Sequence, residues 1–111
     1  MIFDDVIQLA KSVSQFTIAG EGNVSVRDGD AMLIKASGST LETMTDDDLV
    51  RCDLDGNALD GEEKKPSMEV SFHAWILKTF PEINCVCHTH PTNTIKILCS
   101  SRIHDFAYRR L

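Results

Sequence analysis

One helix followed by one strand, each ended by a proline, constrains the fold of this chain more than any other feature. Apolar side chains recur at helical spacing in Met68–Phe80, Ser67 precedes them as a candidate N-cap, and Pro81 cannot continue a helix. The next segment, Asn84–His90, is predicted to be a strand that Pro91 ends. A helix that turns back into a strand predicts a helix packed on a sheet, and therefore an α/β protein.

More helices and strands are predicted ahead of this unit. A first helix, capped by Asp4 or Asp5, carries apolar residues at three- and four-residue spacing: Val6, Leu9, Ala10, Val13 and Phe16. Strands are expected at residues 24–27, 31–36 and 49–54, and the first two form a hairpin through Asp28-Gly29. Thr45 is the predicted N-cap of a short helical turn. We expect the aromatic residues Phe72, Trp75 and Phe80 of the long helix to lie in the core.

The composition limits what the chain can do. Its 111 residues suit one domain, 1–111, and 11 basic against 17 acidic side chains give a formal charge of −6. This charge argues against a general affinity for nucleic acid or for anionic membranes, so an anionic ligand must be bound locally. Asp4 and Asp5 stand where a signal peptide would carry basic residues. We therefore expect a cytoplasmic protein with reduced cysteines.

Two histidines in the segment C-V-C-H-T-H-P are the first candidates for chemistry. Side chains two residues apart in a strand share a face, so His88 and His90 project together, while Cys85 and Cys87 project from the other face. Such a histidine pair can bind one zinc ion, provided that further ligands come from elsewhere. The alternative is a pair of hydrogen-bonded strand histidines without a metal. The cysteines are expected to be core residues, because free cysteine is commonly buried.

Glu69 is predicted to lie close to this histidine pair. The helix that begins near Glu69 rises about 1.5 Å per residue, and the returning strand covers a similar length at about 3.3 Å per residue. The histidines therefore arrive level with the first turn of the helix, where Glu69 can act as a base or a ligand. The alternative is a carboxylate that only benefits from the helix dipole. His73, four residues further on, is expected to pack or to support the site rather than to bind metal.

The same end of the predicted sheet offers an anion-binding pocket. Backbone N–H groups in loops can point at an anion at Gly22-Asn23, at Ser37-Gly38 and at Ser67. A metal beside such a pocket suits a small phosphorylated or carboxylated substrate. Lys35 is taken as an exposed strand lysine, with an anion contact as the alternative.

Five motifs in order resemble the class II aldolase/adducin family: G-N-V-S-V-R (22–27), K-A-S-G (35–38), T-D-D-D-L-V (45–50), P-S-M-E (66–69) and H-T-H-P (88–91). The resemblance implies an α/β/α layered fold around a mostly antiparallel sheet, assembled as a homo-oligomer, a tetramer in full-length members. It also implies that the chain is the N-terminal portion of such a protein. The third metal histidine and the C-terminal tyrosine that acts as acid in the family are absent from this sequence.

The resemblance also implies a role for each candidate residue. His88 and His90 would bind Zn²⁺ or another divalent metal, and Glu69 would be the catalytic base. The substrate phosphate would lie against Gly22, Asn23, Ser37, Gly38 and Ser67. Met68 stands where fuculose phosphate aldolases have a second serine, so one phosphate contact is lost or is made by the backbone.

The function implied by this resemblance is a zinc-dependent lyase of the aldolase type. It would cleave a small sugar phosphate or a related ketose in carbohydrate metabolism. The glutamate distinguishes the chain from the 4-epimerases, which usually carry aspartate at that position. A sugar-phosphate 4-epimerase or dehydratase remains an alternative among enzymes. A noncatalytic, adducin-like interaction module or an inactive fragment is the alternative outside them.

Overall fold

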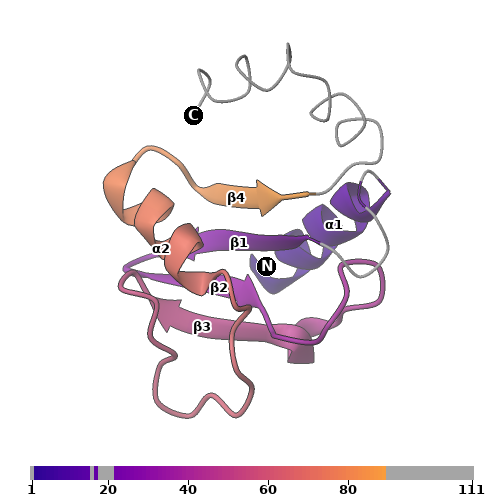
Figure 1. Ribbon diagram of the computed structural model, residues 1–111, viewed down its shortest axis with the longest axis horizontal. Coiled ribbons are helices and arrows are strands. Elements are labelled where there is room, and N and C mark those ends of the chain that lie inside the picture. The colour runs from indigo at the N-terminus through magenta and orange to yellow at the C-terminus, as the bar shows by residue number, and fades with distance from the viewer. Residues whose placement is uncertain (1, 16, 18–21, 90–111) are drawn as a thin grey trace, which may run out of the picture.

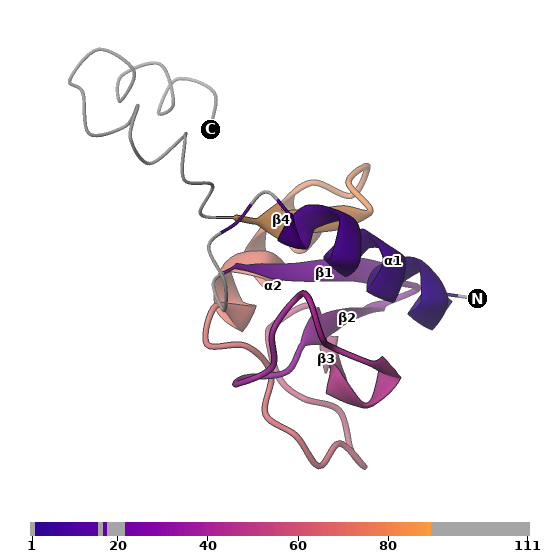
Figure 2. The same cartoon turned by 90° about the vertical axis from the view of Figure 1, so that its right-hand side faces the viewer.

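In the part of the chain that the structure describes, a four-stranded antiparallel sheet carries one helix on each face (Figures 1 and 2). The computed structural model describes residues 2–15, 17 and 22–89. The strands lie in the order β3-β2-β1-β4. In chain order the elements are α1 (Ile2–Ser14), β1 (Asn23–Asp28), β2 (Ala31–Lys35), the 3-10 turn η1 (Asp46–Asp48), β3 (Leu49–Asp53), α2 (Val70–Thr79) and β4 (Cys85–His88). The expected layered α/β architecture around an antiparallel sheet is confirmed.

The interior strand β2 separates two apolar cores. Leu33 packs on the α1 side with Val6 and Ala10 of that helix. Its neighbours Met32 and Ile34 pack on the other side with residues of α2, among them Ala74 and Leu77. Successive side chains of a strand point to opposite faces, so the run M-L-I supplies both cores at once.

The predicted hairpin forms between β1 and β2, but its turn lies one residue later than the expected Asp28-Gly29. Asp28 pairs with Ala31, so the loop consists of Gly29 and Asp30. Gly29 has a φ of +61°, a backbone conformation that glycine adopts at little cost and that the twist of a two-residue hairpin loop requires.

Helix α1 begins earlier than its expected cap. It starts at Ile2, so Asp4 and Asp5 lie in its first turn and neither is the N-cap. Carboxylates are favoured there by the positive end of the helix dipole, which explains why they indicated a helix start without marking its first residue. Phe16, the last apolar position predicted for this helix, lies outside the described residues.

Helix α2 also begins at a different residue from the one predicted. Its N-cap is Glu69, not Ser67. The Ser67 N–H donates to the Lys35 carbonyl at 2.8 Å, and this tertiary bond holds the backbone beside the end of β2 until the helix can start. The helix ends at Thr79, two residues before Pro81, as expected.

The aromatic residues of α2 are not in the core, contrary to the prediction. Phe72 and Trp75 are 52% and 59% exposed, and Phe80 is 38% exposed. The helix places His73, Ala74 and Leu77 against the sheet instead. Because these residues occupy one side of the helix, Phe72 and Trp75 necessarily face away from the sheet.

Strand β1 presents alternating polar and apolar faces that match the two helices. Val24 and Val26 pack in the core beside α1. Asn23, Ser25 and Arg27 lie on the face toward α2. The Arg27 guanidinium donates to the carbonyls of Leu77, Phe80 and Ile83, and so it satisfies carbonyl groups where α2 ends. Within the described residues, no helix is both long and apolar enough to span a membrane.

Candidate active site at the start of α2

Glu69 and His88 meet where α2 begins and β4 ends. Oε2 of Glu69 contacts Nδ1 of His88, although the two residues come from different elements. Strand β4 pairs with β1 in a register that sets His88 opposite Asn23, and this pairing brings the histidine level with the helix start. The expected proximity of Glu69 and His88 is therefore confirmed. His90, the second predicted metal ligand, lies outside the described residues.

Asn23 completes this cluster from the first residue of β1. Its Nδ2 donates a hydrogen bond of 2.8 Å to Oε2 of Glu69, and the side chain is buried. Asn23 and His88 thus contact the same carboxylate oxygen. The Asn23 side chain is thus engaged with protein groups, and the anion contact predicted for the Gly22-Asn23 loop stays a prediction.

The Glu69 carboxyl is held in its ionised form. Partial burial opposes ionisation, but the hydrogen bond from Asn23 and the contacts with His88 outweigh it, and the pKa of Glu69 lies below its ordinary value. At neutral pH the group is therefore a carboxylate, the form that can accept a proton from a substrate.

His73 lies behind Glu69 and is fully buried against β1. Its Nδ1 lies 2.6 Å from the Ser25 hydroxyl, and its Nε2 contacts Oδ1 of Asn23. Burial lowers the pKa of His73 to about 4, so the ring is neutral at physiological pH. The expected packing or supporting place of His73 agrees with these contacts, whereas Ser25 was not singled out from the sequence. Its position two residues after Asn23 in one strand is the signal that could have revealed it.

Gly22 fixes the loop that leads into β1 against β4. Its φ is +90°, and a Cβ atom at this position would lie 2.7 Å from the backbone oxygen of His88. Only glycine permits such an approach without movement of one backbone or the other. Gly22 therefore has a structural role at this site, and the anion contact predicted for it stays a prediction.

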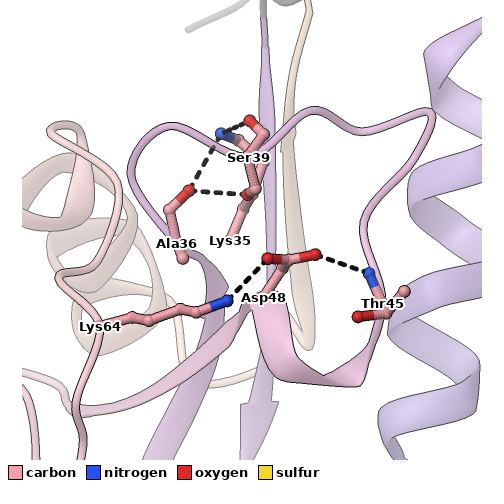
Figure 3. Close-up of polar contacts among 6 residues, drawn as sticks. All are labelled: Lys35, Ala36, Ser39, Thr45, Asp48 and Lys64. Carbon is pink, nitrogen blue, oxygen red and sulfur yellow. Dashed lines mark hydrogen bonds and ion pairs between the residues drawn. The ribbon is translucent and has the colours of Figure 1, made fainter.

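The loop after β2 forms a second part of the site region, drawn in Figure 3. A shallow pocket there is lined by Ala36, Ser37, Gly38, Ser39, Asp48, Lys64 and Lys65. The Ser37 N–H donates to the Lys65 carbonyl at 2.8 Å, and the Ser67 N–H is also bonded. These two backbone groups are thus not free for an anion, contrary to expectation. The exposed Ser37 side chain still lines the pocket.

Lys35 is buried rather than exposed, which corrects the expectation for this residue. Its ammonium group donates to the carbonyls of Ser39 at 2.6 Å and Ala36 at 3.3 Å, and so it fixes the loop that carries Ser37 and Gly38 (Figure 3). Burial lowers the pKa of Lys35, while the carboxylates of Asp48 and Glu69 oppose this shift.

Asp48 also stabilises this region, through contacts with Thr45 and Lys64. Its carboxylate accepts the Thr45 N–H at 2.9 Å and pairs with Lys64 at 3.0 Å (Figure 3). The hydrogen bond from Thr45, followed by the one from Lys64, holds the pKa of Asp48 below its usual range. Thr45 is the N-cap of η1, as predicted.

The imidazole of His88 and the carboxylate of Glu69 are chemically suited to bind a divalent metal. An imidazole and a carboxylate are ordinary zinc ligands, and catalytic zinc sites use about three protein ligands. Within the described residues, however, no group of three or more His, Cys, Asp or Glu side chains is placed to hold a metal. Cys85 and Cys87 do not join the site, since they lie on the opposite face of β4. They are exposed at the edge of the sheet and not buried in the core as expected.

The chain matches the Class II Aldolase and Adducin N-terminal domain over residues 6–109, and it belongs to this family. Among solved structures, an L-fuculose 1-phosphate aldolase superposes with a TM-score of 0.73 at 29% sequence identity, covering 82% of this chain and 44% of that one.

Curated relatives of this chain carry out several reactions. It is 37% identical over 76 residues to L-fuculose phosphate aldolase of Methanocaldococcus jannaschii, covering 68% of this chain and 40% of the relative. It is 35% identical over 97 residues to 3-oxo-tetronate 4-phosphate decarboxylase of Haemophilus influenzae, covering 85% and 45%. It is 37% identical over 97 residues to methylthioribulose-1-phosphate dehydratase of Stenotrophomonas maltophilia, covering 86% and 44%. The chain thus spans less than half the length of these relatives.

Proposed function

We propose that this chain carries the base and part of the metal site of an aldolase-type lyase that acts on a small sugar phosphate or a related ketose. The contact of an ionised Glu69 with His88, held by Asn23, is the observation that carries this proposal. The protein is further proposed to be cytoplasmic and to act as a homo-oligomer.

Glu69 moves the proton in the proposed reaction. In cleavage its carboxylate takes the proton of the ketose hydroxyl whose carbon becomes the aldehyde, the C–C bond breaks with its electron pair passing to the enediolate, and the resulting carboxylic acid gives that proton to the enediolate carbon. Aldol addition follows the same steps in reverse, beginning when the carboxylate removes a proton from the carbon next to the ketone carbonyl. Asn23 and His88 both contact Oε2, which leaves Oε1 outside these contacts and able to face the substrate.

A divalent metal, Zn²⁺ as the first candidate, would be bound by the imidazoles of His88 and His90 and would supply Lewis-acid polarisation of the substrate carbonyl. Nδ1 of His88 contacts the Glu69 carboxylate. A carboxylate that accepts from Nδ1–H orients such a ring and makes it a stronger ligand.

The substrate phosphate is proposed to bind near Gly22, Asn23, Ser37, Gly38 and Ser67. Support comes from the pocket that Ser37 and Gly38 line, because the lysines Lys64 and Lys65 are also among its lining residues. Ser67 lies between this pocket and the base, with its Oγ accepting the Glu69 N–H at 3.3 Å.

Decarboxylation, dehydration or 4-epimerisation of a sugar phosphate is the second candidate among enzymes. The decarboxylase and dehydratase relatives match this chain as strongly in identity as the aldolases do. A noncatalytic, adducin-like module or an inactive fragment is less well supported, because a binding module has no need for an ionised glutamate against a histidine.

The test is an assay of L-fuculose 1-phosphate cleavage by the protein supplied with Zn²⁺, beside Glu69→Gln and the exposed control Glu63→Gln. Loss of a general base should lower kcat by about 100-fold or more in Glu69→Gln, whereas Glu63→Gln should retain the parent rate. Equal cleavage by both variants would contradict the role of Glu69. Release of CO₂ or loss of water from the substrates of the other relatives would instead favour the second candidate.

A further inference from the structure

A row of buried polar side chains runs from the middle of β1 to the carboxylate of Glu69. Ser25 and His73 are completely buried and Asn23 nearly so. Each of them contacts the next: Ser25 with His73, His73 with Asn23, and Asn23 with Glu69. The residues come from β1 and α2, so the row crosses the interface between helix and sheet.

The hydrogen-bond directions in this row follow from the chemistry of the groups. Asn23 donates its amide N–H to Glu69, so its carbonyl oxygen faces His73 and can only accept. Nε2 of His73 must therefore carry the ring proton. In a neutral ring Nδ1 is then an acceptor, and the Ser25 hydroxyl donates to it.

A reversed arrangement would be costly at each link. Turning the Asn23 amide over would place its oxygen against the Glu69 carboxylate, so two acceptors would face one another. Moving the ring proton to Nδ1 would leave Nε2 and the Asn23 oxygen as two buried acceptors in contact. Buried polar groups without a partner destabilise a fold, so the row has one favoured pattern of hydrogen bonds.

We propose that His73 is a positioning residue, whose ring, oriented by Ser25, fixes the Asn23 amide and through it selects Oε2 of Glu69 as the held oxygen. This inference rests on the proposed function, in which Oε1 of Glu69 handles the proton. His73 does not touch the substrate. Its effect is to keep the base in one orientation, as residues behind a catalytic group commonly do.

The first experiment reads the tautomer directly in the unaltered protein. Nitrogen-15 NMR of labelled histidine should show His73 neutral at pH 7, with its proton on Nε2 and slow exchange of that proton with water. A ring that is protonated on Nδ1, or on both nitrogens, would overturn the proposal. This readout needs no activity, so it is independent of whether the protein is an aldolase.

Variants then test whether His73 fixes the Asn23 amide. His73→Gln keeps an N–H donor where Nε2 lies, whereas His73→Phe fills similar space without any donor. The side-chain amide of Asn23, observed by nitrogen-15 NMR, should keep its parent chemical shift and slow exchange in His73→Gln and lose both in His73→Phe. The same response in both variants would overturn the positioning role.

Ser25→Ala gives a milder perturbation in case His73→Phe does not fold. Without the hydroxyl donor, Nδ1 of His73 loses its partner while the Asn23 oxygen still holds the ring proton on Nε2, so the Nδ1 resonance should shift and the Nε2–H signal should remain. An unchanged Nδ1 resonance would contradict the role of Ser25. Where cleavage activity is present, His73→Phe should lower kcat by about 10- to 100-fold and leave KM nearly unchanged. Activity absent from the parent, together with the expected NMR results, would count against the proposed function and not against this inference.

Discussion

Single residues at the site are constrained by contacts that the sequence alone does not reveal. Lys35 reads as a surface lysine in a strand, yet it is buried because its ammonium group satisfies the loop carbonyls of Ala36 and Ser39. Glu69 and His88 could be predicted to meet, because helix and strand lengths fix their levels. The contacts of Ser25, His73 and Asn23 behind Glu69 could not be predicted, because they depend on which face of α2 packs on β1.

Gly22 and Gly38 provide a matched pair for testing close approach. Both have positive φ, but a Cβ at Gly22 would meet the His88 backbone, whereas at Gly38 it would meet nothing within 4 Å. Alanine at either position is strained, so Gly38→Ala should lower the free energy of unfolding by about 1 kcal/mol and Gly22→Ala by clearly more. Urea unfolding of the two variants measures the difference. Equal losses would show that the approach of Gly22 to β4 is not tight.

His73 should make stability fall as the pH is lowered. Its pKa is about 4 in the folded protein against an ordinary value of 6.5, so between these values the unfolded chain binds a proton that the folded chain does not. The stabilisation is complete above pH 6.5 and is lost progressively toward pH 4, with a slope of at most about 1.4 kcal/mol per pH unit. Urea unfolding across this range should give a flatter profile for His73→Gln. Parallel profiles would contradict a neutral buried ring.

At the scale of elements, α2 shows what periodicity can and cannot predict. The helix, its end before Pro81 and the strand that follows were predictable, since helical spacing and proline chemistry are local. Its first residue was not, because Ser67 is held beside β2 by a bond to Lys35. Nor was its buried face, because apolar residues lie around most of the helix and the sheet contacts His73, Ala74 and Leu77.

The two faces of α2 should differ strongly in their contribution to stability. Leu77 is fully buried, and Leu77→Ala should lower the free energy of unfolding by about 2–5 kcal/mol through lost burial and an unfilled cavity. Trp75 is more than half exposed and packs edge-on against Phe80, so Trp75→Ala should cost about 1 kcal/mol or less. Thermal or urea unfolding of both variants decides the matter, and a larger loss for Trp75→Ala would mean that α2 packs on its other face.

At the scale of the whole molecule, the site exists only once the sheet is assembled. Asn23 and Glu69 are 46 residues apart in the chain, and Glu69 and His88 are 19 apart. The order β3-β2-β1-β4 sets β4 beside β1, and α2 crosses the same face, so the three side chains meet at one end. The motif G-N-V-S-V-R serves both faces of the sheet, because its polar residues face α2 and its valines face α1.

The central claim is that Glu69 and His88 belong to one metal-dependent site. Calorimetric titration of Zn²⁺ into the purified protein, beside a His88→Ala/His90→Ala double variant, tests it most directly. The account predicts stoichiometric binding by the parent that is lost in the double variant. No binding by the parent, or binding that survives the loss of both histidines, would contradict it.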